Sequence, residues 1–290
     1  MPPPPEDEDI APAPELLTRT IPSSGDTVPA LGIGTWQTFD VGDSARDRRP
    51  LEKVLRRFVE RGGRVIDTSP MYGRSEEVVG ELTADIPRAR LFVATKVWTR
   101  GRRAGIEQME RSSSLFRGTR TPLDLMQVHN LLDVETHLPV LREWKRQGRI
   151  RYLGITHYTS SAYRDIEALL RREALDFLQI NYSPVEPEAD RRLLPLAVER
   201  GVAVIANRPF GGGGPLRRAI GKPLPSVARE LSCTSWPQLF LKWILGHPAV
   251  TCAIPATSRV RHLDEILDAA LEPLPDERQR TEIAVAVSML

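Results

Sequence analysis

Eight short apolar runs, rich in β-branched residues, alternate along this chain with longer amphipathic segments. Most runs begin about 25 to 35 residues after the run before, which is the length of one strand–helix unit. This alternation predicts parallel strands joined by right-handed helical crossovers, and therefore an α/β fold. The predicted strands are Leu31–Thr35, Arg64–Asp67, Leu91–Lys96, Leu123–His129, Tyr152–Thr156, Phe177–Asn181, Val202–Ala206 and Thr251–Pro255.

The segments between the strands carry apolar residues at helical spacing. Glycines that follow several of these segments are typical of helix ends. The predicted helices are Leu51–Arg61, Ile106–Phe116, Thr136–Gln147, Ala162–Arg172, Glu188–Arg200, Ser235–Gly246 and His262–Ala270.

Two architectures accommodate eight parallel strands: a closed barrel and an open doubly wound sheet. The open sheet that binds dinucleotides carries a G-x-G-x-x-G turn after its first strand. Here Gly32-Ile33-Gly34 is followed by Thr35-Trp36-Gln37, so the third glycine is missing. The strand count and this missing glycine favour a (β/α)8 barrel, or TIM barrel. A turn cluster between residues 18–21 and 27–30 adds a short N-terminal β-hairpin.

The chain has 290 residues, a length that suits one α/β barrel domain. Residues 1–14 are rich in proline and acidic side chains, which predicts a disordered tail before a single barrel domain over residues 15–290. This tail lacks the basic start and apolar stretch of a secretory signal. No apolar run approaches the roughly 20 residues of a membrane span. We therefore expect a cytoplasmic protein without a membrane partner.

Charge and residue types disfavour several function classes. Forty Lys and Arg side chains balance 38 Asp and Glu side chains, whereas nucleic-acid binders usually carry a strong basic excess, so we expect no nucleic-acid partner. The two cysteines, Cys233 and Cys252, suit a reduced compartment. The five histidines include no H-x-H or H-E-x-x-H spacing, which disfavours a metal-dependent hydrolytic barrel. We expect no metal, and a monomer is the default expectation.

Four polar residues lie at or just after the ends of three neighbouring predicted strands. Asp67, Lys96 and His129 end these strands, and Tyr72 follows Asp67 in a loop. The carboxyl ends of barrel strands form the catalytic face, so these side chains should meet. An ammonium beside a tyrosine favours the phenolate and lowers its pKa. Such a set could protonate the alkoxide that forms during carbonyl reduction, although each residue alone also fits a buried ion pair or a packed ring.

Five stretches of this sequence resemble the aldo-keto reductase family. They are Ile66–Gly73 with Ser75-Glu76 (family signature IDTAxxYGxSE), Ala94–Val97, Leu125–His129, Gln179–Tyr182 and Ile254–Ser258. The resemblance runs from about Val28 to about Leu271. It implies an NADP(H)-dependent oxidoreductase that reduces aldehydes or ketones to alcohols by hydride transfer from nicotinamide. It places the family's catalytic tetrad on Asp67, Tyr72, Lys96 and His129, with Tyr72 as general acid.

The resemblance also implies cofactor contacts, with departures from the family pattern. A Ser-Asn pair that holds the carboxamide is replaced by Thr156-His157, and a tyrosine that often stacks on nicotinamide is replaced by Asn207. The family commonly has a lysine at the position of Ala256. In this chain the positive charge for the adenosine 2′-phosphate would therefore come from the arginines that follow Ala256. The expected cofactor-binding residues are Thr156, His157, Gln179, Asn207, Arg208, Pro209, Phe210, Gly211, Thr257, Ser258, Arg259, Arg261 and Glu265.

Each group of these residues has an expected partner on the cofactor. Phe210 is a substitute candidate for the nicotinamide stack, and the glycines from Gly211 onward suit either a pyrophosphate or a plain flexible loop. Hydroxyls and arginines at a helix start suit the 2′-phosphate, which favours NADP(H) over NAD(H). Glu265 aligns with a family residue that contacts adenine.

Trp36, Met71 and Trp98 follow the first three predicted strands. We expect them to line the pocket for a small-molecule carbonyl substrate of apolar character, although the two tryptophans also fit a packing role. The alternative function is a non-catalytic NADP(H)-binding protein with a regulatory or redox-sensing role.

Overall fold

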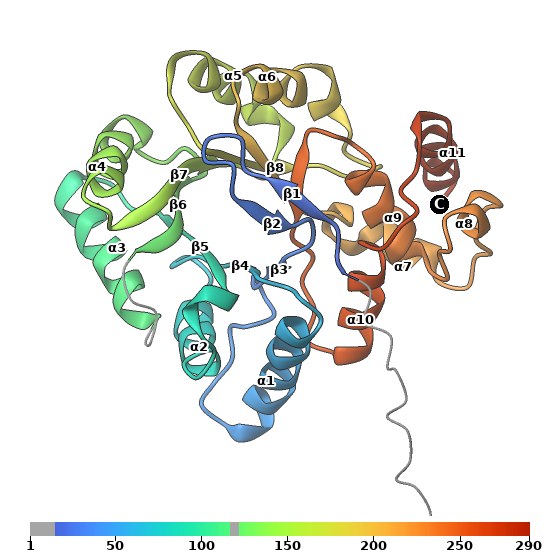
Figure 1. The fold of residues 1–290 in the computed structure, drawn as a ribbon, viewed down its shortest axis with the longest axis horizontal. Helices are drawn as coiled ribbons and strands as arrows, with labels where there is room; N and C mark the ends of the chain where they lie inside the picture. The colour runs from blue at the N-terminus through green and yellow to red at the C-terminus, as the bar shows by residue number, and fades with distance from the viewer. Residues whose placement is uncertain (1–14, 117–121) are drawn as a thin grey trace, which may run out of the picture.

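Eight parallel strands form the centre of the molecule, with helices around them (Figure 1). The structure is a computed structural model and describes residues 15–116 and 122–290, so the predicted tail at residues 1–14 lies outside the described residues. The strands are hydrogen-bonded in the order β10-β9-β8-β7-β6-β5-β4-β3. Their bounds are β3 Ile33–Gly34, β4 Val65–Asp67, β5 Phe92–Val97, β6 Leu123–His129, β7 Ile150–Thr156, β8 Phe177–Asn181, β9 Ala203–Asn207 and β10 Val250–Ala253.

Backbone contacts between the first and last strands close the sheet into a barrel. Leu31 forms a parallel bridge with Ala253, and Gly32 N donates to Ala253 O at 2.9 Å. Gly34 N donates to Pro255 O at 2.8 Å, and a Cβ on Gly34 would lie only 2.9 Å from Ile254 O. The glycine therefore serves the close approach of the strands. The predicted (β/α)8 barrel is confirmed.

The predicted N-terminal hairpin is also confirmed. Strands β1 (Thr18–Thr20) and β2 (Thr27–Pro29) pair antiparallel. Ile21 and Val28 of the hairpin belong to the same buried cluster as Val65 and Phe92, which lie at the starts of their strands. The hairpin thus closes the amino-terminal end of the barrel and leaves the carboxyl end for chemistry.

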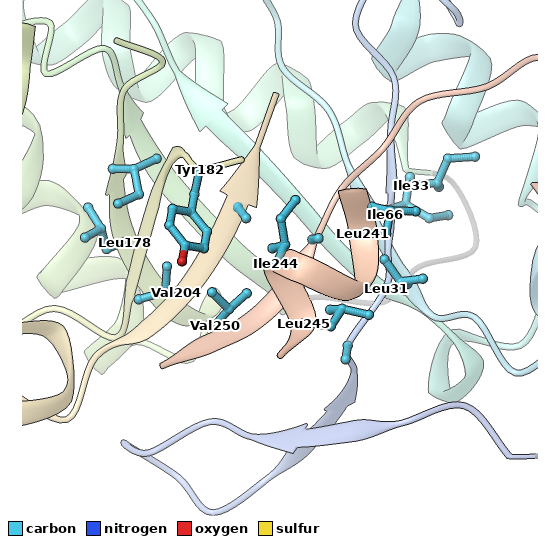
Figure 2. Packing of buried hydrophobic residues seen from close by; sticks show 14 of the residues in the cluster. Leu31, Ile33, Ile66, Leu178, Tyr182, Val204, Leu241, Ile244, Leu245 and Val250 are labelled. Atoms are coloured by element: carbon cyan, nitrogen blue, oxygen red, sulfur yellow. The ribbon is translucent and has the colours of Figure 1, made fainter. Parts of the chain in front are cut away.

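The helices lie outside the strands and bury their apolar faces against them. Figure 2 shows Ile244 and Leu245 of α9 near Val250 of β10, and Leu241 of the same helix near Ile66 of β4. The helices are α1 Ala45–Glu60, α2 Ser75–Leu82, α3 Arg102–Leu115, α4 Val134–Arg146, α5 Tyr163–Arg172, α6 Leu193–Glu199, α7 Gly214–Ala219, α8 Val227–Glu230, α9 Trp236–Leu245, α10 Val260–Asp268 and α11 Glu277–Ser288.

The structure adds helical residues that the sequence pattern did not predict. Helix α1 begins at Ala45 rather than Leu51, because Ser44 caps it by accepting from Asp47 N and the helix continues through Pro50. Helices α2, α7, α8 and α11 were not predicted. Helix α11 follows a capping box at Asp276 and packs against α9, so the segment after Leu271 is a structured part of the barrel's outer layer.

Candidate active site

Asp67, Lys96 and His129 lie together at the carboxyl ends of β4, β5 and β6. All three are almost completely buried. The Lys96 ammonium donates to Asp67 Oδ1 and to Thr68 O, both at 2.7 Å. Burial opposes the charged amine, but the charge of Asp67 and the hydrogen bond to its carboxylate outweigh this effect, so the pKa of Lys96 is raised above its ordinary value. Lys96 is therefore an ammonium ion at neutral pH.

Tyr72 reaches the same place from the loop between β4 and α2. Its ring centroid lies 5.0 Å from Lys96 Nζ and 5.7 Å from the His129 ring centroid. Burial raises the pKa of Tyr72, and the charge of Lys96 acts in the opposite direction without overcoming it. Lys96 acts to lower the pKa of Tyr72, as expected, but the net effect of all groups is to raise that pKa. Tyr72 thus holds its proton at neutral pH, as a proton donor must.

Glu76 anchors the start of α2, just after Tyr72. It is buried, and its carboxylate oxygens accept from Thr95 Oγ1 at 2.5 Å and from Ser112 Oγ at 3.1 Å. Burial raises the pKa of Glu76. Because Thr95 precedes Lys96 on β5, this contact fixes the loop of Tyr72 relative to the lysine.

His129 is held by a serine that the sequence analysis overlooked. Ser69 Oγ lies 3.0 Å from His129 Nδ1 and accepts a hydrogen bond from Met71 N at 3.2 Å. Burial, together with the charges of Lys96 and His157, lowers the pKa of His129 to about 3, so its ring is neutral. We predict that the Ser69 hydroxyl donates to Nδ1, so that Nε2 carries the ring proton and serves as the donor. The only sequence signal was the place of Ser69 two residues after Asp67.

Large exposed apolar side chains surround these four residues at the carboxyl end of the barrel. Trp36 is 49% exposed, and Met71 and Trp98 are each 40% exposed. Tyr158, which the sequence analysis did not single out, is 48% exposed and stacks on His157 with ring centroids 5.4 Å apart. The Trp98 ring centroid lies 6.4 Å from that of His129. These side chains give the site an apolar rim.

The next strands along the barrel end in amide and hydroxyl groups. Thr156 and Gln179 are buried, and Gln127 Nε2 donates to Gln179 Oε1 at 3.0 Å. Asn207 Nδ2 donates to His157 O at 2.9 Å. Gln127 Oε1 and Asn207 Oδ1 are buried acceptors with no hydrogen-bond partner among the described residues. A primary amide can satisfy such acceptors, so this region fits a nicotinamide carboxamide.

The segment after β9 is ordered by short helical turns. Gly211, Gly212 and Gly213 have φ values of 55°, 73° and 83°, so they form a left-handed turn before α7 rather than a regular 3-10 helix. Phe210 packs with its edge toward Phe240, with ring centroids 6.3 Å apart. Because the Phe210 ring already contacts Phe240, its stacking on nicotinamide stays a prediction. Arg208 follows Asn207 and pairs with Glu186 at 3.3 Å, and Pro209 lies between Arg208 and Phe210.

The last group of predicted cofactor residues lies where β10 leads into α10. Thr257 is buried, and its Oγ1 accepts from Arg259 N at 3.2 Å. Ser258, Arg259 and Arg261 are exposed, and Glu265 lies half-buried on α10. This group lies at the same end of the barrel as the tetrad, since both follow the carboxyl ends of strands.

Two further observations concern the part of the chain that the structure describes. Within residues 15–116 and 122–290, no group of three or more His, Cys, Asp or Glu side chains is arranged to hold a metal ion. Among the helices of these residues, none is both long and apolar enough to cross a membrane.

Comparison with known proteins places this chain in a family. The methylglyoxal reductase YeaE of Escherichia coli is 29% identical over 86% of this chain and 88% of its own length. The NADP-dependent D-sorbitol-6-phosphate dehydrogenase of Malus domestica is 24% identical, over 88% and 89%. An aldo/keto reductase from Klebsiella pneumoniae, solved with NADP and acetate, superposes with a TM-score of 0.76 at 24% identity, over 91% and 93%. Residues 30–281 match the profile of the Aldo/keto reductase family. The chain belongs to the aldo-keto reductase family.

Proposed function

We propose that the protein is an NADP(H)-dependent reductase of aldehydes and ketones, with Tyr72 as the general acid. The observation that carries this proposal is the buried pair of Lys96 and Asp67 beneath a protonated tyrosine. The ring of the neutral His129 lies beside that tyrosine, with the two ring centroids 5.7 Å apart. The pair, the tyrosine and the histidine together are suited to an oxygen atom that gains negative charge during reaction.

The positions of these groups define how a proton would move during carbonyl reduction. The cofactor, when bound, supplies a hydride from nicotinamide to the carbonyl carbon. Tyr72 donates its hydroxyl proton to the carbonyl oxygen, so the product is a neutral alcohol. The Lys96 ammonium stabilises the phenolate left on Tyr72, and Asp67 holds Lys96 in place. His129 donates from Nε2 to the same oxygen and thereby orients the substrate.

The cofactor would lie across the ends of β7 to β10. Thr156, Gln179 and Asn207 would hold the carboxamide, and the segment Arg208–Gly211 would face the pyrophosphate. Thr257 and Arg259 would contact the adenosine end. The apple relative is named as NADP-dependent and the Klebsiella neighbour was solved with NADP, which supports this choice of cofactor. The apolar rim of Trp36, Met71, Trp98 and Tyr158 suits an apolar carbonyl compound.

The test is NADPH oxidation by the purified protein with 4-nitrobenzaldehyde and, separately, with methylglyoxal. Wild type is compared with Tyr72→Phe, with NADH in place of NADPH as the cofactor control. NADPH binding is measured in parallel from the change in protein fluorescence. We expect turnover that falls by at least about 100-fold in Tyr72→Phe while NADPH still binds, since general acids contribute roughly 10²–10⁴-fold.

Two other outcomes are informative. Tight NADPH binding without turnover of any carbonyl compound would favour a non-catalytic, nucleotide-sensing protein. Equal activity in wild type and Tyr72→Phe would remove Tyr72 from the mechanism.

A further inference from the structure

A hollow of about 360 Å³ lies on the rim of the barrel between α1 and the start of α10. Its size is at the small end of the roughly 300–1,000 Å³ range of ligand sites. Four of its lining residues carry a positive charge and none carries a negative charge. The lining consists of Ala45, Arg46, Arg49, Pro50, Lys53, Ser258, Arg259 and Val260.

The charges reach the hollow from two parts of the chain that are about 200 residues apart in sequence. Arg46, Arg49 and Lys53 are spaced by three and four residues on α1, so they share one face of that helix. Arg259 immediately precedes α10. Helices α1 and α10 lie side by side (Figure 1) and are in contact. The hollow is therefore a place where α1 and the β10–α10 turn can hold one ligand together.

None of these four side chains pairs with a carboxylate within residues 15–116 and 122–290. Other arginines of α1 and of its C-cap do: Arg48 pairs with Asp43, Arg56 with Glu52 and Asp85, and Arg57 and the C-cap Arg61 with Asp264. Asp43, Glu52, Asp85 and Asp264 are thus already engaged by other arginines. Like charges that face one another repel, and a bound anion would relieve that repulsion.

The rest of the hollow is also suited to an anion. Helix α10 has nine residues, and no side chain caps the free N–H groups of its first turn. Those N–H groups add positive potential at the same point. The β10–α10 turn itself supplies one lining cation, Arg259, whereas α1 supplies three.

We propose that α1 supplies most of the charge that binds the adenosine 2′-phosphate of NADP(H). Arg46, Arg49 and Lys53 face Arg259 across the hollow, and the phosphate binds between them. This inference rests on the proposed function, because it places the adenosine end of the cofactor at the β10–α10 turn. A phosphomonoester carries close to two negative charges at pH 7 and accepts bidentate hydrogen bonds from arginine. Because NAD(H) lacks this group, these residues determine the preference for NADP(H).

The test measures binding by calorimetry and needs no turnover. The probes are 2′,5′-ADP and 5′-ADP, which differ only in the 2′-phosphate. The test variant is Arg46→Ala/Arg49→Ala/Lys53→Ala. The matched control is Arg164→Ala/Arg191→Ala/Arg229→Ala, which also removes three exposed cations that form no ion pair within the described residues. Circular dichroism verifies that both variants are folded.

Wild type should bind 2′,5′-ADP at least about 10-fold more tightly than 5′-ADP, since hydrogen bonds between charged groups are strong. The test variant should lose this preference while its affinity for 5′-ADP changes less than about twofold. The control variant should keep the preference. Arg46→Lys/Arg49→Lys should retain part of it, because the charge remains and the bidentate geometry is lost.

The remaining outcomes separate the two proposals. If the test variant keeps the full preference for 2′,5′-ADP, the assignment of α1 is wrong and the reductase proposal is unaffected. If the control variant loses as much affinity as the test variant, the effect is that of net charge and the assignment is again wrong. If wild type binds neither 2′,5′-ADP nor NADPH, both proposals fail.

Discussion

Ser69 and His129 are joined by a hydrogen bond of 3.0 Å between the serine hydroxyl and Nδ1 of the ring. Ser69 Oγ also accepts from Met71 N, which keeps the hydroxyl in place beside the imidazole. We predict that Ser69 donates its own proton to Nδ1 and is a positioning residue that keeps the donor proton of His129 on Nε2. Neutral imidazole has two tautomers, and only one of them can donate toward a substrate oxygen.

Ser69→Ala should lower kcat/KM for carbonyl reduction by about 10-fold, the equivalent of one hydrogen bond of about 1.4 kcal/mol. Affinity for NADPH should not change. Ser69→Thr keeps the hydroxyl and should retain most of the activity. The ¹⁵N chemical shifts of His129 should show the Nε2–H tautomer in wild type and a mixture in Ser69→Ala. An unchanged tautomer in Ser69→Ala would contradict the positioning role.

Lys96 and Asp67 form a buried pair, and removing only one of them leaves an unpaired charge in the barrel. Lys96→Met should lower the free energy of unfolding by about 3–5 kcal/mol, measured by urea denaturation. Lys96→Met/Asp67→Asn should recover part of that loss, because no buried charge remains. Both variants should be inactive. A double variant as unstable as Lys96→Met would mean that the loss comes from packing and not from charge.

His129 makes stability depend on pH in the acid range. Burial lowers the pKa of His129 from 6.5 to about 3, so the folded protein keeps the ring neutral while the unfolded chain protonates it. The unfolded state therefore binds more protons below pH 6.5, and stability falls as pH decreases toward 3. Above pH 6.5 this histidine has no effect.

The slope attributable to one such proton is about 1.4 kcal/mol per pH unit. His129→Gln should remove most of this slope, seen as a smaller difference in the free energy of unfolding between about pH 6 and pH 4.5. His157 and several carboxylates titrate in both proteins, so only the difference between them is informative. Equal slopes in wild type and His129→Gln would show that His129 does not stay neutral.

The sequence predicted the barrel because each strand end is marked by a local pattern. The runs that end in Asp67, Lys96 and His129 are buried strands, and their ends meet for reasons of topology alone. The positions of α2 and α11 could not be predicted in the same way. Helix α2 begins with the buried polar residues Ser75 and Glu76, so it lacks a clear apolar face at its start.

Features that depend on residues far apart in the sequence also could not be predicted from it. The hollow between α1 and α10 joins Arg49 to Arg259, and no local pattern pairs residues that far apart. The net direction of the pKa of Tyr72 depended on how deeply its ring is buried, which outweighs the charge of Lys96. The role of Gly34 also depends on a distant residue, because its missing Cβ leaves room for Ile254 O and so lets the first and last strands approach.

Gly34 gives the sharpest test of that closure. An alanine there would place its Cβ 2.9 Å from Ile254 O, and a backbone oxygen cannot move away without opening the contact between β3 and β10. Gly34→Ala should therefore lower the free energy of unfolding by about 1–3 kcal/mol, the range for overpacked positions. Gly42→Ala is the matched control, because its Cβ would meet only Asp47 Oδ2 at 3.8 Å and its φ is not positive. Thermal unfolding should show a clear loss for Gly34→Ala and little change for Gly42→Ala. Equal stability of the two variants would mean that the strands can separate at this point without loss, and that barrel closure does not depend on the glycine.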